Sequence, residues 1–149
     1  MSLNHIPRGY HSITPYLSVK DPKNLIGFIT SVFDASEKEM MKDDAGNVMH
    51  AEYQIGDSVV MISQARDPWP ETPAAMYVYV KDVDAAFKRA LASGATSIME
   101  PADQFYGDRH GGVKDSNGNS WWIATHIEDV SPEEMKRRSE EWAKSRSAT

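Results

Sequence analysis

The sequence of 149 residues contains no cysteine. That absence excludes disulfides, a thiol nucleophile, and zinc or iron–sulfur sites with cysteine ligands. No apolar run approaches the roughly 18–20 residues that a membrane-spanning helix needs. The first residues also lack the apolar core of a secretory signal peptide. We therefore expect a soluble, cytoplasmic protein with no membrane partner.

Positive charge is in short supply as well. Lysine and arginine total 16 against 22 acidic residues, so the formal net charge is −6. No basic field is available for nucleic acid, and we expect no such partner. The sequence also lacks a glycine-rich phosphate loop and a G-x-S-x-G nucleophile motif. A hydrophobic content of 40% is typical of a globular chain.

The hydrophobic pattern runs through one series of elements and then repeats it. The first series is a strand over 11–19, a helix over 22–33, and strands over 37–43, 48–55 and 58–64. The second is a strand over 74–81, a helix from Asp82 to near Gly94, and strands over 96–100, 110–115 and 119–126. A charged helix over 131–146 closes the chain, opened by Ser131 with a capping box.

Short motifs recur at a nearly constant offset. The triplet Val19–Asp21 recurs as Val80–Asp82, 61 residues later, and Gly56–Ile62 corresponds to Gly118–Ala124, 62 residues later. A constant offset across two elements indicates an internal duplication. We predict an α+β fold of two βαβββ repeats, 11–65 and 74–127, whose curved mixed sheets pair around a cavity. A proline-rich linker, 66–73, joins them and carries an exposed Trp69.

The order of several short motifs resembles the vicinal oxygen chelate superfamily, and its PhnB-like branch above all. These motifs are Ile13–Leu17, Val48–Glu52, Ile55–Ser58, Tyr79–Asp84, Phe105–Arg109, Ala124–His126 and Glu128–Met135. The superfamily includes glyoxalase I, bleomycin-resistance proteins and extradiol dioxygenases. The resemblance implies a small-molecule ligand and a homodimer, with repeats paired within or between chains. It leaves open whether the chain is an enzyme, because one scaffold supports several chemistries.

The resemblance also implies four metal-ligand positions, two on the first strands and two on the last strands of the repeats. In this sequence those positions hold Thr14, Ala75, Val60 and Trp122, none of which is a plausible ligand. We therefore expect a cavity without a metal or another cofactor. The alternative is a metal-dependent lyase, isomerase or dioxygenase with shifted ligands. A shifted register would give a divalent metal His50, Glu52 and His126.

Strand alternation predicts an aromatic lining for the cavity. The residues expected there are Thr14, Tyr16, Tyr77, Tyr79 and Trp122, with Arg109 nearby. Such a lining suits a small aromatic or cationic molecule. The other interpretation is that these aromatics fill the core or a dimer interface. Alternation also places Val60, Ile62 and Gln64 on the face that matches Trp122, and turns Trp121 toward the helices.

A third interpretation is an enzyme that uses no metal. His110 or His126 would act as general base, and Arg109 would hold an anionic group of the substrate. The structural alternative is that Asp108 and Arg109 form a salt bridge that fixes their loop. Nothing in the sequence separates the third interpretation from simple ligand binding.

Overall fold

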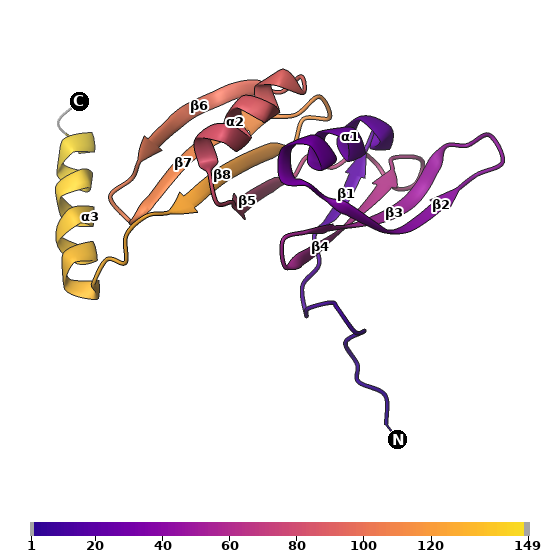
Figure 1. Ribbon diagram of the computed structural model, residues 1–149, viewed down its shortest axis with the longest axis horizontal. Coiled ribbons are helices and arrows are strands. Elements are labelled where there is room, and N and C mark those ends of the chain that lie inside the picture. Colours follow the sequence, from indigo (N-terminus) through magenta and orange to yellow (C-terminus); the bar gives the residue numbers. More distant parts are fainter. Residues whose placement is uncertain (1, 148–149) are drawn as a thin grey trace.

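The computed structural model describes residues 2–147 and contains two four-stranded sheets (Figure 1). The first repeat consists of β1 (Tyr16–Val19), α1 (Pro22–Phe33), β2 (Ser36–Lys42), β3 (Val48–Ile55) and β4 (Ser58–Gln64). Its strand order is β1-β4-β3-β2, with β1 parallel to β4 and the other pairs antiparallel. The first strand is shorter than predicted, so Thr14 precedes it.

The second repeat has the same topology. It consists of β5 (Ala75–Tyr79), α2 (Val83–Ala92), β6 (Thr96–Asp103), β7 (Asp108–Lys114) and β8 (Ser120–His126). Its order is β5-β8-β7-β6, again with a parallel pair at one edge. The predicted α+β fold with two βαβββ units is therefore confirmed.

Both repeat helices begin where the sequence places an aspartate. The Asp21 carboxylate accepts a hydrogen bond of 3.1 Å from the backbone N–H of Asn24. The Asp82 carboxylate accepts one of the same length from Ala85. Each carboxylate satisfies a backbone N–H that has no partner within its helix. The repeated Lys-Asp pair therefore marks the same strand-to-helix transition in both halves.

The two repeats share one core at the junction of α1 and α2, which lie next to each other in Figure 1. Trp121 of β8 is fully buried, as predicted. Its ring centroid lies 5.7 Å from that of Phe28 and 5.3 Å from that of Phe33, both on α1. A large aromatic side chain of the second repeat thus completes the core of the first.

A buried polar turn between β7 and β8 also joins the repeats. Its centre is Asp115, whose carboxylate accepts hydrogen bonds from the backbones of Asn117 and Asn119 and from the indole of Trp121. Asn117 in turn exchanges two hydrogen bonds with the backbone of Asp21, at 2.8 and 2.9 Å. The start of α1 is therefore fixed by a turn almost one hundred residues away.

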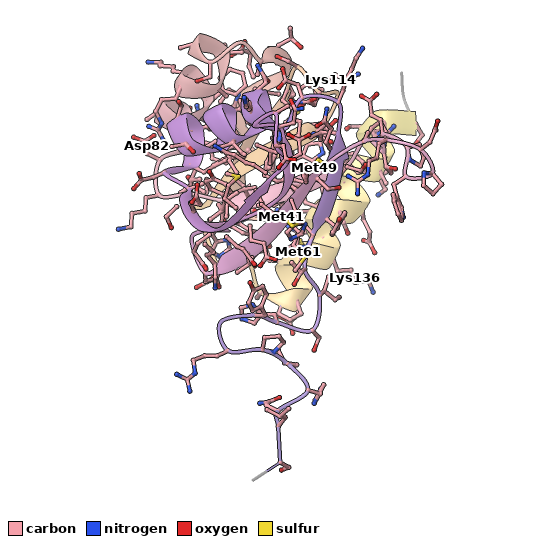
Figure 2. All side chains as sticks on the ribbon, turned by 90° about the vertical axis from the view of Figure 1, so that its right-hand side faces the viewer. Met41, Met49, Met61, Asp82, Lys114 and Lys136 are labelled. Carbon is pink, nitrogen blue, oxygen red and sulfur yellow. The ribbon has the colours of Figure 1, made fainter. Side chains whose placement is uncertain are left out.

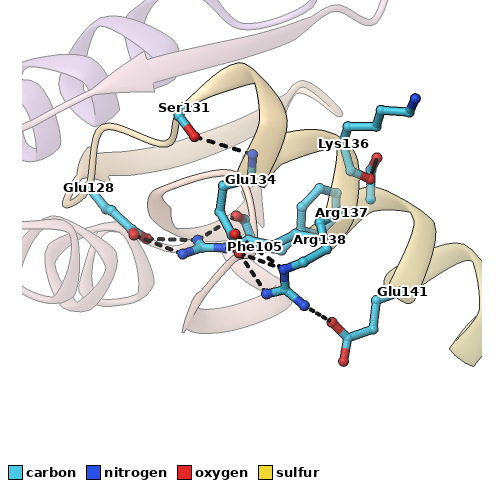
Figure 3. A network of polar contacts seen from close by, with 9 residues as sticks. Phe105, Glu128, Ser131, Glu134, Lys136, Arg137, Arg138 and Glu141 are labelled. Carbon is cyan, nitrogen blue, oxygen red and sulfur yellow. Dashed lines mark hydrogen bonds and ion pairs between the residues drawn. The ribbon is translucent and has the colours of Figure 1, made fainter.

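Helix α3 (Pro132–Ser147) lies at the far end of the second sheet and has no buried residue. Ionic contacts attach it (Figure 3). Arg138 donates to the carbonyl of Phe105 at 3.0 Å and to the carboxylate of Glu128 at 2.8 and 2.9 Å. The ring of Trp142 lies 5.6 Å from that of Phe105. No helix in residues 2–147 is both long and apolar enough to span a membrane.

Candidate functional site

The strand register determines which side chains face away from the helices. Leu17 pairs with Ile62 in the first sheet, and Val78 pairs with Ile123 in the second. Met61 is therefore the counterpart of Trp122. The expected match between Val60 and Trp122 is wrong, because Val60 lies in the helix-side core, as does Ile62.

The reason is one additional residue in the second turn. Residues 56–57 separate the paired Ile55 and Ser58, whereas residues 116–118 separate the equivalent Asp115 and Asn119. Counting strand positions forward from the turn glycine therefore gives β4 and β8 registers that differ by one residue. Because side chains alternate along a strand, a slip of one residue moves each of them to the opposite face.

The first sheet and the linker border an open pocket of about 730 Å³ on the side away from α1. We call it the first-sheet pocket. It is lined by Tyr16, Ser18, Met41, Lys42, Met49, His50, Ser63, Gln64, Arg66, Trp69, Pro70 and Thr72. Figure 2 labels two of its apolar side chains, Met41 and Met49. The volume is within the range typical of small-molecule sites.

The linker forms one wall because it is held against the edge of β1. Ser18 donates a side-chain hydrogen bond of 2.9 Å to the carbonyl of Pro70 and accepts a backbone hydrogen bond of 3.1 Å from Thr72. The backbone N–H of Arg66 donates to the carbonyl of Trp69 at 2.8 Å. These bonds hold Trp69 at the pocket, with its side chain 60% exposed.

His50 lines the pocket and is oriented by a buried carboxylate. Its Nε2 lies 2.9 Å from Oε2 of Glu52, and the other carboxylate oxygen accepts a hydrogen bond from the hydroxyl of Tyr10. The hydrogen bonds from Tyr10 and His50 hold the pKa of the Glu52 carboxyl below its usual value. The hydrogen bond between Tyr10 and Glu52 also raises the pKa of the Tyr10 hydroxyl. Glu52 is thus a buried anion with one hydrogen-bond partner within the chain on each carboxylate oxygen.

The second sheet carries a different cluster on the equivalent face, centred on the buried Asp108. Its carboxylate accepts hydrogen bonds from the hydroxyls of Tyr77 at 2.7 Å and Tyr79 at 2.9 Å, and lies 2.9 Å from Nδ1 of His126. Burial raises the pKa of Asp108, but the hydrogen bonds from His126 and the tyrosines outweigh it and hold this pKa below its usual value. The hydrogen bond to Asp108, with a second to Asp129, raises the pKa of His126.

His110 lies beneath this cluster. Its Nδ1 is 2.9 Å from the hydroxyl of Tyr106, and its ring packs 5.2 Å from Tyr77 and 5.4 Å from Trp122. Its Nε2 is buried and has no hydrogen-bond partner among the described residues. Burial lowers the pKa of His110, so the ring is neutral at pH 7.

The site residues predicted from the sequence fall into two groups. Tyr16 lines the first-sheet pocket, and the second-sheet cluster contains the others that face away from the helices: Tyr77, Tyr79, Trp122, His110 and His126. Thr14 belongs to neither group. The structure does not bring the two groups together within one chain.

Arg109 points to the opposite face of β7, because it alternates with Asp108 and His110. Its guanidinium lies 3.1 Å from carboxylate oxygens of Asp84 and Asp103. The expected Asp108–Arg109 salt bridge therefore does not form. Arg109 binds α2 to β6 instead, away from both histidines.

The shifted metal set is likewise split, since His50 and Glu52 lie on the first sheet and His126 lies on the second. Among residues 2–147, no group of three or more histidine, aspartate or glutamate side chains is placed to hold a metal ion. The sequence interpretation missed most of the pocket lining, namely Ser18, Met41, Lys42, Met49, Ser63, Arg66, Trp69, Pro70 and Thr72. Alternation along β4 in the correct register would have found Ser63.

Comparisons of the sequence and of the structure with known proteins agree on one family. The family model of the Glyoxalase/Bleomycin resistance protein/Dioxygenase superfamily matches residues 3–123. An uncharacterized protein of Mycobacterium bovis is 32% identical over 139 residues, covering 84% of this chain and 90% of its own. Among solved structures, TioX from Micromonospora sp. ML1 is 25% identical with a TM-score of 0.68, covering 78% of this chain and 99% of its own. The PhnB protein from Bacillus cereus, 22% identical, shares the fold with a TM-score of 0.63, covering 77% and 99%.

Proposed function

The chain belongs to the glyoxalase/bleomycin resistance protein/dioxygenase superfamily, and from that premise we propose that it binds a small planar aromatic molecule in the first-sheet pocket. The observation that supports this is the lining. Tyr16 and Trp69 present aromatic surface around a volume of about 730 Å³, and Met41 and Met49 add polarizable thioethers. Aromatic and thioether groups together suit a flat apolar ligand.

The second-sheet cluster supports this choice by contrast. Its carboxylate already accepts three hydrogen bonds, and the indole of Trp122 covers the strand beside it. Binding there would require breaking contacts that the chain makes with itself, whereas the first-sheet pocket is open.

The test is binding of N-phenyl-1-naphthylamine, a neutral aromatic probe whose fluorescence rises in apolar surroundings. Trp69→Ala and Tyr16→Ala should each weaken binding about 10-fold, equivalent to about 1.4 kcal/mol. Trp142→Ala is the matched control, because Trp142 is also partly exposed but lies on α3. Equal affinity in all four proteins would contradict the proposal.

We also propose that the protein is a homodimer. Tyr77 and Tyr79 are 42% and 62% exposed on β5, at the edge of the second sheet, and exposed apolar patches mark interaction sites. Sedimentation equilibrium should give twice the mass of the chain, and a purely monomeric mass at micromolar concentration would exclude the dimer.

A further inference from the structure

We propose that the ligand is a planar aromatic acid, and that Arg66 binds its anionic group. This inference rests on the proposed function, since it names the chemical class that the same pocket selects. It also chooses between the two ligand classes that the sequence leaves open, an aromatic molecule and a cationic one.

The charges in the lining are the first argument. Lys42 and Arg66 line the pocket, and no aspartate or glutamate does. Neither cation forms an ion pair with a carboxylate among residues 2–147. The chain as a whole carries a net charge of −6, so this is a local reversal of sign. Unpaired cations beside apolar walls attract an anion and repel a cation.

The buried carboxylate behind His50 does not cancel this charge by pairing with either cation. Glu52 does not line the pocket, and its two oxygens are held by Tyr10 and His50. Arg66 is therefore left with its donors available to a ligand.

The position of Arg66 supplies the second argument. The hydrogen bond from its backbone N–H to the Trp69 carbonyl closes a tight turn, and its guanidinium carbon lies 5.3 Å from the centre of the Trp69 ring. A planar fork of donors thus sits beside an aromatic surface. This arrangement suits a carboxylate or sulfonate attached directly to a flat ring, because the acid can pair bidentately while the ring stacks.

Lys42 contributes differently because of where it lies. In the order β1-β4-β3-β2 it belongs to one edge of the sheet, whereas the linker with Arg66 lies against the other edge. At a strand spacing of about 4.8 Å the two edges are about 14 Å apart, so we expect a small acid paired with Arg66 not to reach Lys42. Lys42 therefore adds longer-range attraction, which salt screens.

Three probes with one ring system test the inference: 2-naphthoate, 2-naphthamide and 2-naphthylmethylammonium. They are anionic, neutral and cationic respectively, and binding is measured by calorimetry at low ionic strength. We expect 2-naphthoate to bind about 10-fold more tightly than 2-naphthamide, and the ammonium compound to bind most weakly.

Variants then locate the source of the preference. Arg66→Gln should weaken 2-naphthoate about 10-fold and leave 2-naphthamide unchanged, and Arg66→Lys should restore part of the loss. Lys42→Gln should lower the affinity for 2-naphthoate about two- to threefold. Lys23→Gln, which removes the same charge from α1 on the opposite side of the sheet, should have no effect.

The outcomes separate the two proposals. Equal binding of all three probes, weakened about 10-fold by Trp69→Ala, would retain the aromatic pocket and overturn the preference for an acid. Equal weakening of all probes by Arg66→Gln would also overturn it, because Arg66 would then only support the wall. Absence of binding by every probe, or binding insensitive to Trp69→Ala, would overturn the proposed function itself.

Discussion

The two sheets share a topology, yet one leaves the face away from its helix open and the other fills it. The register makes the comparison position by position. His50 pairs with Ser63 in the first sheet, and His110 pairs with Ala124 at the equivalent place in the second. His50 lines an open pocket, whereas His110 is covered by tyrosine and tryptophan rings.

A neighbouring pair of positions explains the difference. Glu52 pairs with Met61 in the first sheet, and Gly112 pairs with Trp122 in the second. The glycine removes a side chain from β7 and thereby makes room for the indole from β8. In the second sheet glycine stands where the first has Glu52, and tryptophan stands where the first has Met61. These two substitutions are enough to cover one face of a duplicated scaffold without changing its backbone topology.

A side chain added to β7 beside Trp122 should cause the largest loss of stability. A Cβ at position 112 would lie 2.2 and 2.4 Å from ring atoms of Trp122. We expect Gly112→Ala to lower the free energy of unfolding by about 3 kcal/mol, because a rigid indole must move. Chemical denaturation measures the loss.

Gly27→Ala is the control, since Gly27 lies within α1 and has open space around it. That substitution should stabilise the protein by up to about 1 kcal/mol. In the Gly112→Ala background, Trp122→Leu should recover part of the loss. A Gly112→Ala protein as stable as the original would show that the indole is not fixed there.

Neutralising Asp108, at the centre of the second-sheet cluster, should cause an intermediate loss of stability. Asp108→Asn removes a buried charge that accepts three hydrogen bonds, and we expect a loss of about 1–3 kcal/mol at neutral pH. The pKa of His126 should fall, because the bond to Asp108 is the main reason that it is raised. A pKa of His126 that stays unchanged in an NMR titration would contradict this network.

The same pair predicts a pH window in the original protein. The folded-state pKa of Asp108 lies below the ordinary value of 3.8, so its contribution is present above that pH and is lost on further acidification. The pKa of His126 is raised above 6.5, so its contribution is present below that pH and is lost as the pH rises through the folded value. Asp108→Asn should therefore weaken the pH dependence of stability below 3.8 and above 6.5, while between these values both contributions are constant.

The smallest loss of stability is expected from a substitution in the first repeat. Glu52→Gln keeps the shape of the side chain but removes the charge shared by Tyr10 and His50, and should cost about 1 kcal/mol. The pKa of Tyr10 should return toward its ordinary value, which ultraviolet absorbance detects between pH 9 and 12. An unchanged Tyr10 titration would mean that the segment before β1 does not contact Glu52 in solution.

The sequence allowed the fold to be predicted because its signals are local. Asp21 and Asp82 act as helix caps through their own side chains, and Trp121 follows from alternation along one strand. The pocket depends instead on contacts between distant segments. The linker forms a wall only because Ser18 binds Pro70, which no periodicity reveals.

The error of face in β4 has the same origin. The turn before β8 is one residue longer than the turn before β4, and it contains the buried Asp115 network. Motif matching aligned the turn glycines, whereas hydrogen bonding aligns the strands. The placement of Arg109 was missed because its partners, Asp84 and Asp103, come from two other elements.

The packing of Trp121 against Phe28 and Phe33 has a consequence for how the chain could be divided. The duplicated segment is a unit of sequence but not a unit of folding, since Trp121 of the second copy packs against the aromatic rings of α1 in the first. A chain cut within the linker should yield two fragments that remain largely unstructured apart and reassemble when mixed. For the same reason the linker is a suitable place for new termini in a circular permutant, provided that the joint between Asn117 and Asp21 is preserved.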